Sequence, residues 1–122
     1  MDDRKEALYK FWSSFNLPAY EETSVPEGAK MPYITFESSI GEFNAVLSLS
    51  ASIWDRTTEG TTFIDRKADE IQRFIKNMGC PKIEGGRFRA FTEGVYCQTK
   101  NDPEDRLIKR NVLTVFFEFM TD

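Results

Sequence analysis

The chain has 122 residues, 40% of them hydrophobic and 14% aromatic, and its 16 basic and 20 acidic side chains give a net charge of −4. This length fits one domain over residues 1–122, and the aromatic content argues against disorder. The negative balance argues against a protein that holds duplex DNA by neutralising phosphates. Because the chain has no histidine, Ser-His-Asp and Cys-His catalysis and His-ligated zinc sites are excluded.

The two cysteines and the apolar stretches of the chain indicate whether the protein binds metal and in which compartment it is made. Cys80 and Cys97 are too few and too far apart for a Cys-ligated metal site, so we expect no metal and no cofactor. No stretch reaches the roughly 18 apolar residues of a membrane span, so we expect no membrane contact. Met1–Glu6 is charged and no apolar segment follows it, so we expect no signal peptide and favour two reduced cysteines in a protein made in a cytoplasm, with a disulfide between them as the alternative.

The first predicted element is a helix near the N-terminus. One apolar stripe with i, i+3, i+4, i+7 spacing indicates it: Leu8, Phe11, Trp12 and Phe15. The helix should end at Asn16–Pro18, because the residue before a proline disfavours helical geometry. Residues 16–32 contain three prolines and show no periodicity, so we expect a long surface loop there.

Two strands and a second helix should follow. Tyr33–Glu37 is rich in β-forming residues, and residues 43–53 alternate between apolar and small polar side chains. Thr62 and Asp65 have the spacing of a capping box. The helix they begin should run from about Phe63 to Met78, since its apolar residues repeat in steps of three and four: Ile64, Ala68, Ile71, Ile75 and Met78.

The remainder indicates more sheet. Lys82–Ala90 predicts a short strand broken at Gly85-Gly86, Val95–Thr99 a further one, and Arg106–Met120 a long strand that is central or covered on both sides. The predicted fold class is α+β, with a mainly antiparallel sheet of about four to five strands and two principal helices packed on it.

No group of residues makes a convincing active site, and we expect the protein not to be an enzyme. Carboxylate chemistry from Asp55, Glu59 or Asp65 is the enzymatic alternative. The basic residues of the second half, interleaved with Phe88, Phe91 and Tyr96, give a nucleic-acid alternative. Strand aromatics are more often core residues, which argues against that second alternative.

Other features suit contact with another protein. The polar face of the predicted strand at 43–53 is unusually small-sided, which permits close approach of a second surface: Asn44, Ser48, Ser50 and Ser52. The loop before Pro32 offers three candidates for exposure, Tyr20, Val25 and Met31, and Tyr and Met are enriched at interfaces. Trp54 lies where the strand should leave the sheet, so we expect it at a rim. Intramolecular packing is the alternative for each of these residues.

The layout of the chain resembles the tail terminator proteins of long-tailed bacteriophages, also called tail-completion or head–tail joining proteins. The likeness extends over nearly the whole chain and consists of layout more than of a diagnostic motif. The stretches that carry it are Glu6–Trp12, Leu17–Tyr20, Val25-Pro26, Pro32–Phe36, Ile53–Arg56, Ala68–Ile71 and Ile108–Leu113.

The resemblance implies a structural role in the virion tail, with assembly in the host bacterial cytoplasm. Such proteins form a ring, commonly a hexamer, that caps the tail tube, stops its polymerisation and joins it to the head–neck connector. The genome passes through the ring without sequence-specific binding. The residues expected to face the lumen or a ring face are acidic: Glu21, Glu22, Glu27, Asp55 and Glu59.

A ring also implies a head-to-tail contact that closes on itself. One copy would offer a loop or a sheet edge, and the next a small-sided surface such as Asn44–Ser52. The alternative function is a small acidic phage-encoded adaptor or inhibitor that binds another protein without assembling into a ring.

Overall fold

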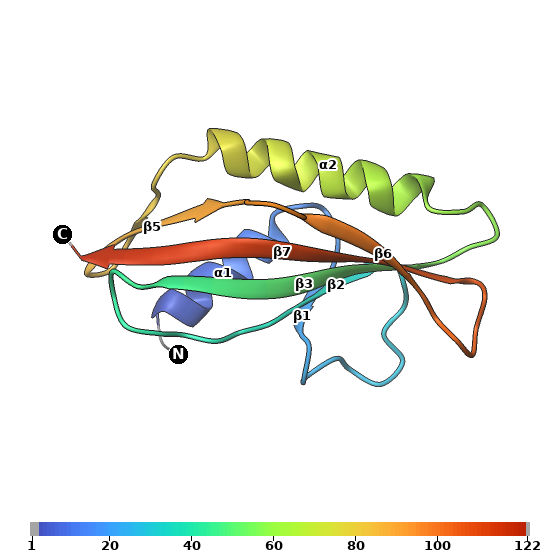
Figure 1. The fold of residues 1–122 in the computed structure, drawn as a ribbon. Coiled ribbons are helices and arrows are strands. Elements are labelled where there is room, and N and C mark those ends of the chain that lie inside the picture. The colour runs from blue at the N-terminus through green and yellow to red at the C-terminus, as the bar shows by residue number, and fades with distance from the viewer. Residues whose placement is uncertain (1–2, 122) are drawn as a thin grey trace.

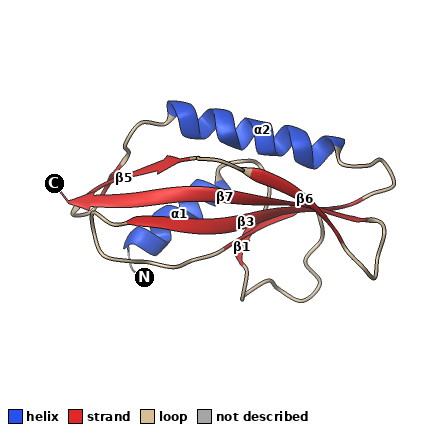
Figure 2. Cartoon of the chain, viewed as in Figure 1, coloured by secondary structure: helices blue, strands red, loops and turns tan. Residues whose placement is uncertain are grey.

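The computed structural model describes residues 3–121 as two helices and seven strands (Figures 1 and 2). In chain order they are α1 (Asp3–Ser13), β1 (Ala19–Glu21), β2 (Tyr33–Phe36), β3 (Val46–Arg56), α2 (Thr62–Asn77), β4 (Lys82–Ile83), β5 (Gly86–Phe91), β6 (Cys97–Asn101) and β7 (Ile108–Thr121). The seven strands form one curled sheet. Within residues 3–121, both helices pack on the same side of it.

The longest strand, β7, is the centre of the sheet. The strand order is β1-β2-β3-β7-β5-β4, and β6 continues the line of β5 along the same edge of β7. Pairing of β3 with β7 extends from Val46 opposite Glu118 to Arg56 opposite Ile108. Every paired couple is antiparallel except β1 and β2, which run parallel. The sheet is therefore mixed.

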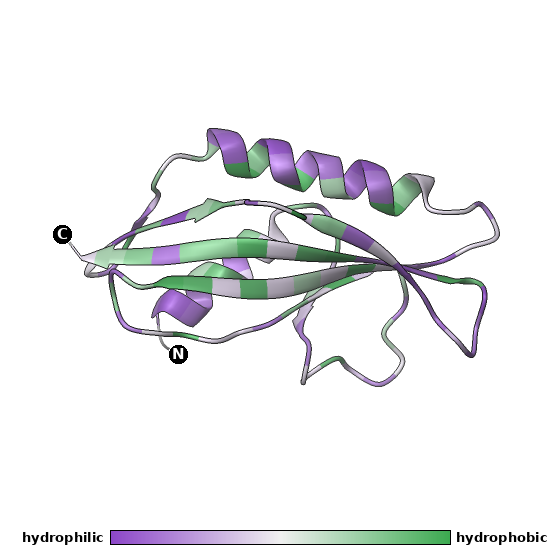
Figure 3. Cartoon of the chain, in the orientation of Figure 1, coloured by the Kyte–Doolittle hydropathy of each residue, from purple (hydrophilic) through white to green (hydrophobic). Residues whose placement is uncertain are grey.

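The core lies between the helices and the near side of the sheet. Phe11 of α1 is at its centre, because its ring meets four other rings edge-on at centroid distances of 4.8–5.9 Å: Trp12, Phe15, Phe74 and Phe117. On α2 the residues of the predicted apolar stripe are buried, and the hydrophobic side of the helix faces the sheet in Figure 3. Both helices are thus held by the burial of apolar area.

Polar contacts fix the position of α2. Asn111 of β7 is fully buried; its Nδ2 donates to Asp65 Oδ1 (2.9 Å), and its Oδ1 accepts from Thr99 Oγ1 (2.7 Å). The hydroxyl of Tyr96 donates to the Ala68 carbonyl of α2 (2.9 Å). Burial and the nearby Cys97 and Asp69 raise the pKa of the Tyr96 phenol, which therefore remains a donor at neutral pH. One helix is thereby tied to β6 and β7.

The predicted sheet of four to five mainly antiparallel strands is wrong. Seven strands form a mixed sheet that curls into a half-barrel, and strand outweighs helix, 38% to 23% of the described residues. The sequence predicts a loop at β1, because a three-residue strand is too short to show a period. The parallel pairing of β1 with β2 is fixed only by the tertiary fold. The curl follows from the right-handed twist that accumulates across many paired strands.

Three smaller expectations also need correction. The long loop at 16–32 contains β1, so it is not wholly irregular. α2 begins at Thr62 after the N-cap Thr61, whose side chain makes no capping bond and instead donates to Asp65 Oδ2 (2.9 Å), so the predicted capping box does not form. β7 is central as predicted, but within residues 3–121 helices cover only one of its faces.

Candidate functional site: the open face of the sheet

The face of the sheet that points away from both helices is the main candidate for a functional surface. We call it the open face. It consists of every second side chain of three strands: β3 from Val46 to Trp54, β7 from Arg110 to Met120, and β5 from Arg87 to Phe91. Directly opposed residues on paired strands point to the same side, so the register alone assigns these side chains to one surface.

The serines of β3 lie on the open face, as their alternation predicts. Ser48 is opposite Phe116, Ser50 is opposite Thr114, and Ser52 is opposite Val112. Ser48 is exposed, Ser50 is half-buried and Ser52 is buried. A row of small side chains thus runs beside a row of larger, partly apolar ones.

Asn44 does not lie in this row, although the sequence grouped it with the serines. It precedes β3 in a turn, with φ of 67°, a left-handed conformation that Asn tolerates better than most residues. Its backbone N–H donates to the Phe119 carbonyl (2.6 Å). Asn44 therefore closes the connection into β3 and is not part of the contact surface.

Trp54 anchors one end of the open face. The Arg110 guanidinium lies 4.4 Å from the Trp54 ring centroid, and Arg110 Nε donates to Ser52 Oγ (3.0 Å). Trp54 Nε1 donates to Thr35 Oγ1 of β2 (2.9 Å). Each named polar atom of the group has a partner within the chain, so Trp54 is an internal clamp on β2, β3 and β7 and not the free rim residue that was expected.

The other end of the open face is apolar. Phe116 of β7 stacks on Phe91 of β5 with ring centroids 5.4 Å apart, and Val46 beside them is 51% exposed. Arg89 covers Phe91 at 4.6 Å, and its Nε donates to Glu118 Oε1 (2.7 Å). Because the two charges neutralise each other, this end offers apolar area with little electrostatic bias.

Of the three predicted loop candidates, only Tyr20 lies on the same face of the sheet as the serines. Tyr20 is part of β1, where its ring meets that of Tyr33 edge-on at 5.7 Å. Val25 and Met31 are half-buried in the connection from β1 to β2. Tyr20 is opposite Thr35, which is opposite Ser52, so Tyr20 shares the face of the serines at a distance of two strands, whereas Val25 and Met31 lie outside the strands.

The predicted acidic residues fall into two groups. Glu21 and Glu22 line a polar hollow of about 260 Å³ at the β1 edge, together with Lys5, and Glu27 is exposed in the following connection. Asp55 is the penultimate residue of β3 and accepts the N–H of Arg56. Only part of the predicted acidic set is therefore freely exposed.

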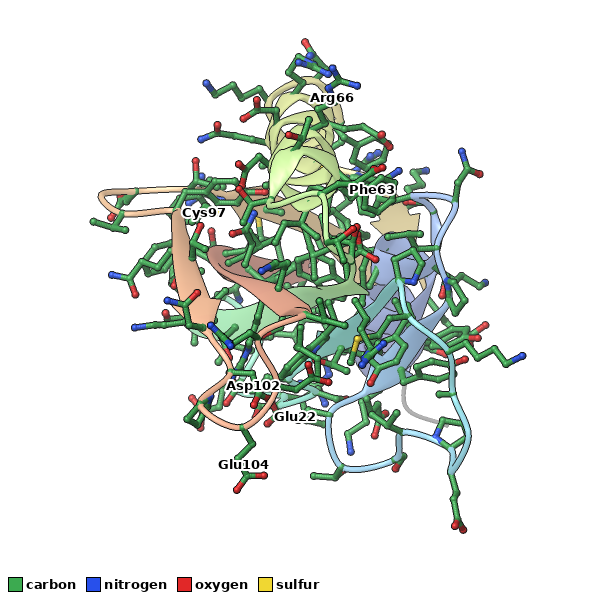
Figure 4. The ribbon with its side chains drawn as sticks, turned by 90° about the vertical axis from the view of Figure 1, so that its right-hand side faces the viewer. Glu22, Phe63, Arg66, Cys97, Asp102 and Glu104 are labelled. Carbon is green, nitrogen blue, oxygen red and sulfur yellow. The ribbon has the colours of Figure 1, made fainter. Side chains whose placement is uncertain are left out.

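One end of the molecule gathers several connections. The Thr57 N–H donates to the Leu107 carbonyl, which joins the connection that carries the exposed Glu59 to the one between β6 and β7. Figure 4 looks onto this end, where Glu22, Asp102 and Glu104 lie on the side away from α2. This arrangement was not evident in the sequence, because it depends on how the strands end in space.

A second hollow, which the sequence does not predict, lies on the helix side of the sheet. It has a volume of about 520 Å³ between α1, the end of α2 and β4, and its apolar walls include Phe11, Phe74 and Ile83. Charged side chains surround it on α1 and β4. No sequence pattern marks this hollow, because the turn after α2 creates it by bringing β4 beside α1.

Asp65, one of the carboxylates named in the enzymatic alternative, has hydrogen-bond partners within the chain. Both carboxylate oxygens of Asp65 accept hydrogen bonds, from Asn111 and Thr61. Burial, with Asp65 and Asp69 nearby, raises the pKa of the Cys97 thiol, which lowers its thiolate content at neutral pH. Cys80 is exposed, and both cysteines are free. In this range no three metal-ligating side chains are grouped, and no helix has the length and apolarity to cross a membrane.

The three aromatic residues on which the nucleic-acid alternative depends are not free to stack on bases. Phe88 and Tyr96 are buried in the core, and Phe91 is covered by Arg89 and Phe116. In comparisons with protein-family models, with characterised proteins and with solved structures, nothing matches the chain.

Proposed function

We propose that this protein is a structural subunit that acts by self-association and not by making or breaking covalent bonds. More particularly, we propose that it is the tail terminator of a long-tailed bacteriophage. In this proposal about six copies close into a ring on the end of the tail tube, stop its polymerisation and form the joint to the head–neck connector. The genome then passes through the ring without sequence-specific binding.

The observation that carries the proposal is the apolar end of the open face. Val46 and Phe116 place aliphatic and aromatic area beside the small side chain of Ser48, while the Arg89–Glu118 pair neutralises the charge at its border. Interface cores in protein complexes are depleted in net charge and enriched in aromatic residues. The open face therefore supports contact with a protein, and we assign it to the end of the tail tube.

The exposed acidic connections fit the same proposal. Glu22 and Glu27 follow β1, and Glu59 precedes α2, so these carboxylates stand outside the sheet. A passage for DNA that is lined with negative charge repels phosphate and does not retain it. We assign these residues to the lumen or to an exposed ring face in the virion tail.

A genetic experiment tests the proposal. Deletion of the coding sequence from the virus that carries it should leave tails of uncontrolled length that do not join heads, as seen by electron microscopy. The intact coding sequence supplied in trans should restore normal particles. The double variant Ser48→Arg/Ser50→Arg should not, because two long charged side chains on the open face prevent close approach.

A matched control changes the charge equally on the other side of the sheet. Gln72→Arg/Asn77→Arg on α2 should restore normal particles as well as the natural chain does. Tails of normal length after the deletion would refute the terminator function and favour the adaptor or inhibitor. Full restoration by the serine double variant would exclude the open face as the contact with the tube.

A further inference from the structure

We infer that neighbouring copies join by main-chain pairing between β6 of one copy and the first half of β3 of the next. This inference rests on the proposed function and adds to it the segments that connect the copies.

The first segment is β6, an unpaired edge. β6 pairs with β7 on one side only. The Thr114 N–H donates to the Tyr96 carbonyl (2.8 Å), and in an antiparallel pair the hydrogen-bonded residues alternate. The backbone groups of Cys97, Thr99 and Asn101 therefore point away from β7, where no described strand pairs with them. All of β6 from Gln98 onwards is exposed.

The second segment is the first half of β3. β2 pairs with β3 only along Ala51–Trp54, and the pairing ends at Ser50. There Glu37 donates its N–H to the Ser50 carbonyl and accepts the Ser50 N–H at its own Oε1 (2.9 and 3.0 Å). By the same alternation, the backbone groups of Ser48 and Val46 point away from β7, and they have no main-chain partner among the described residues.

These segments are complementary in position. They lie on opposite edges of the sheet, so one copy can offer β6 while the next offers β3. Both strands run antiparallel to β7 and hence in the same direction. A rotation about an axis that runs close to the strand direction keeps that direction, so the contact is a parallel pair between two different surfaces, the kind of contact that closes into a ring.

Their offset along the sheet sets the geometry of the ring. The middle of β6 is opposite Asn111, and the free part of β3 is opposite Phe117. Six residues along a strand correspond to about 20 Å. Neighbouring copies are therefore shifted along the strand direction, and the ring closes because the strands tilt against its axis, as strands do in barrels.

Charge supports the contact between β6 and the first half of β3. Lys100 is exposed on β6, and the connection that runs into β3 carries Glu37 and the exposed Glu42. These carboxylates lie at the two ends of the free half of β3, Glu37 opposite Ser50 and Glu42 just before Ala45, so the pairing brings the lysine of one copy to an acidic edge of the next. β1, the remaining edge strand on that side, has only three residues, and its Glu21 carbonyl already accepts the Ser24 N–H. It therefore offers no comparable edge.

The test replaces one outward N–H. Thr99→Pro removes a donor that does not contribute to the β6–β7 pairing, and proline is tolerated on strand edges at such positions. Thr99→Ala is the matched control, since it also loses the hydrogen bond to Asn111 but keeps the N–H. Sedimentation velocity over a concentration series, with electron microscopy, should show rings for the natural chain and for Thr99→Ala, and monomers for Thr99→Pro.

A cross-link tests the pairing directly. In a background with Cys80→Ser and Cys97→Ser, the pair Ser48→Cys/Gln98→Cys places one thiol on the open face of each strand. Oxidation should give a ladder of covalently linked copies under denaturing conditions. Each single-cysteine variant should give at most a dimer.

The outcomes separate the two proposals. Rings formed by Thr99→Pro as readily as by the natural chain would overturn the edge pairing and leave the terminator function standing. Natural protein that is monomeric at every concentration and yields no ladder would also overturn the pairing, and the tail-length experiment would then decide the function alone. Normal tails after deletion of the coding sequence would refute the function whatever holds the copies together.

Discussion

Replacement of Asn111 by alanine tests whether the polar contacts that fix α2 stabilise the fold. The Asn111 amide is fully buried on the helix side of β7 and connects three elements, with Asp65 on α2 and Thr99 on β6 as its partners. Alanine removes both hydrogen bonds and leaves the partners in place. α2 then keeps its apolar packing and the hydrogen bond from Tyr96 to Ala68, and β6 keeps its main-chain pairing with β7, but the side-chain link between the two is lost.

The magnitude follows from the two partners. A hydrogen bond to a charged group contributes about 1.5–3 kcal/mol and a neutral one about 0.5–1.5 kcal/mol. Asp65 and Thr99 are both exposed residues and can turn to water once Asn111 is gone, which reduces the loss. We therefore expect Asn111→Ala to lower the free energy of unfolding by about 2–3 kcal/mol, a large part of the 5–15 kcal/mol typical of a domain.

Urea denaturation followed by tryptophan fluorescence measures this change. The midpoint should fall while the slope m stays constant, since the surface exposed on unfolding is nearly unchanged. In a double-mutant cycle with Asp65→Ala, the coupling energy should exceed about 1 kcal/mol. A loss below about 0.5 kcal/mol, within the range of ordinary surface substitutions, or a coupling energy near zero would refute the reasoning.

Two further substitutions test the packing of β5 and the charge on the connection before β7. At Gly86 a Cβ would meet the backbone carbonyl of Met120, so Gly86→Ala should lower the free energy of unfolding by about 2–3 kcal/mol in the same assay; an unchanged midpoint would contradict that geometry. The Leu107 N–H and the Arg56 side chain hold the pKa of Asp105 below its ordinary value of 3.8. The stability that the ionised Asp105 contributes is present above pH 3.8 and is lost as the pH falls through the lowered pKa. The natural chain should therefore be more stable than Asp105→Asn by a constant amount near pH 7, and this difference should vanish in acid. A stability difference that grows in acid would refute the assignment.

Periodic patterns predicted the long elements well. The buried residues Ile64, Ala68, Ile71 and Ile75 lie on one side of α2, and the structure starts and ends this helix within one residue of the predicted bounds. The alternation in residues 43–53 assigned the serines of β3 to one face. Both patterns extend over enough residues for a period to be visible, which is why they could be read from the sequence alone.

The sheet as a whole could not be predicted in the same way. β1 and β4 have three and two residues, too few to show alternation. Tyr20 was expected in a loop because Pro18 and Pro32 surround it, yet β2 places it in a strand by parallel pairing. Trp54 was expected at a rim, but Arg110 and Thr35, both distant in sequence, hold it internally. Such contacts exist only once the strands are ordered.

The open face shows where the sequence signal for function lies. Burial on the helix side dictates Leu49, Ala51 and Ile53, because larger or polar side chains there would disrupt the core. No comparable demand applies to Ser48 and Ser50, since threonine, which is enriched in strands, would serve a solvated strand better. The small side chains opposite Phe116 and Thr114 thus go beyond what the fold requires. The reason that we propose is a second surface that approaches closely, and the arginine substitutions measure whether it exists.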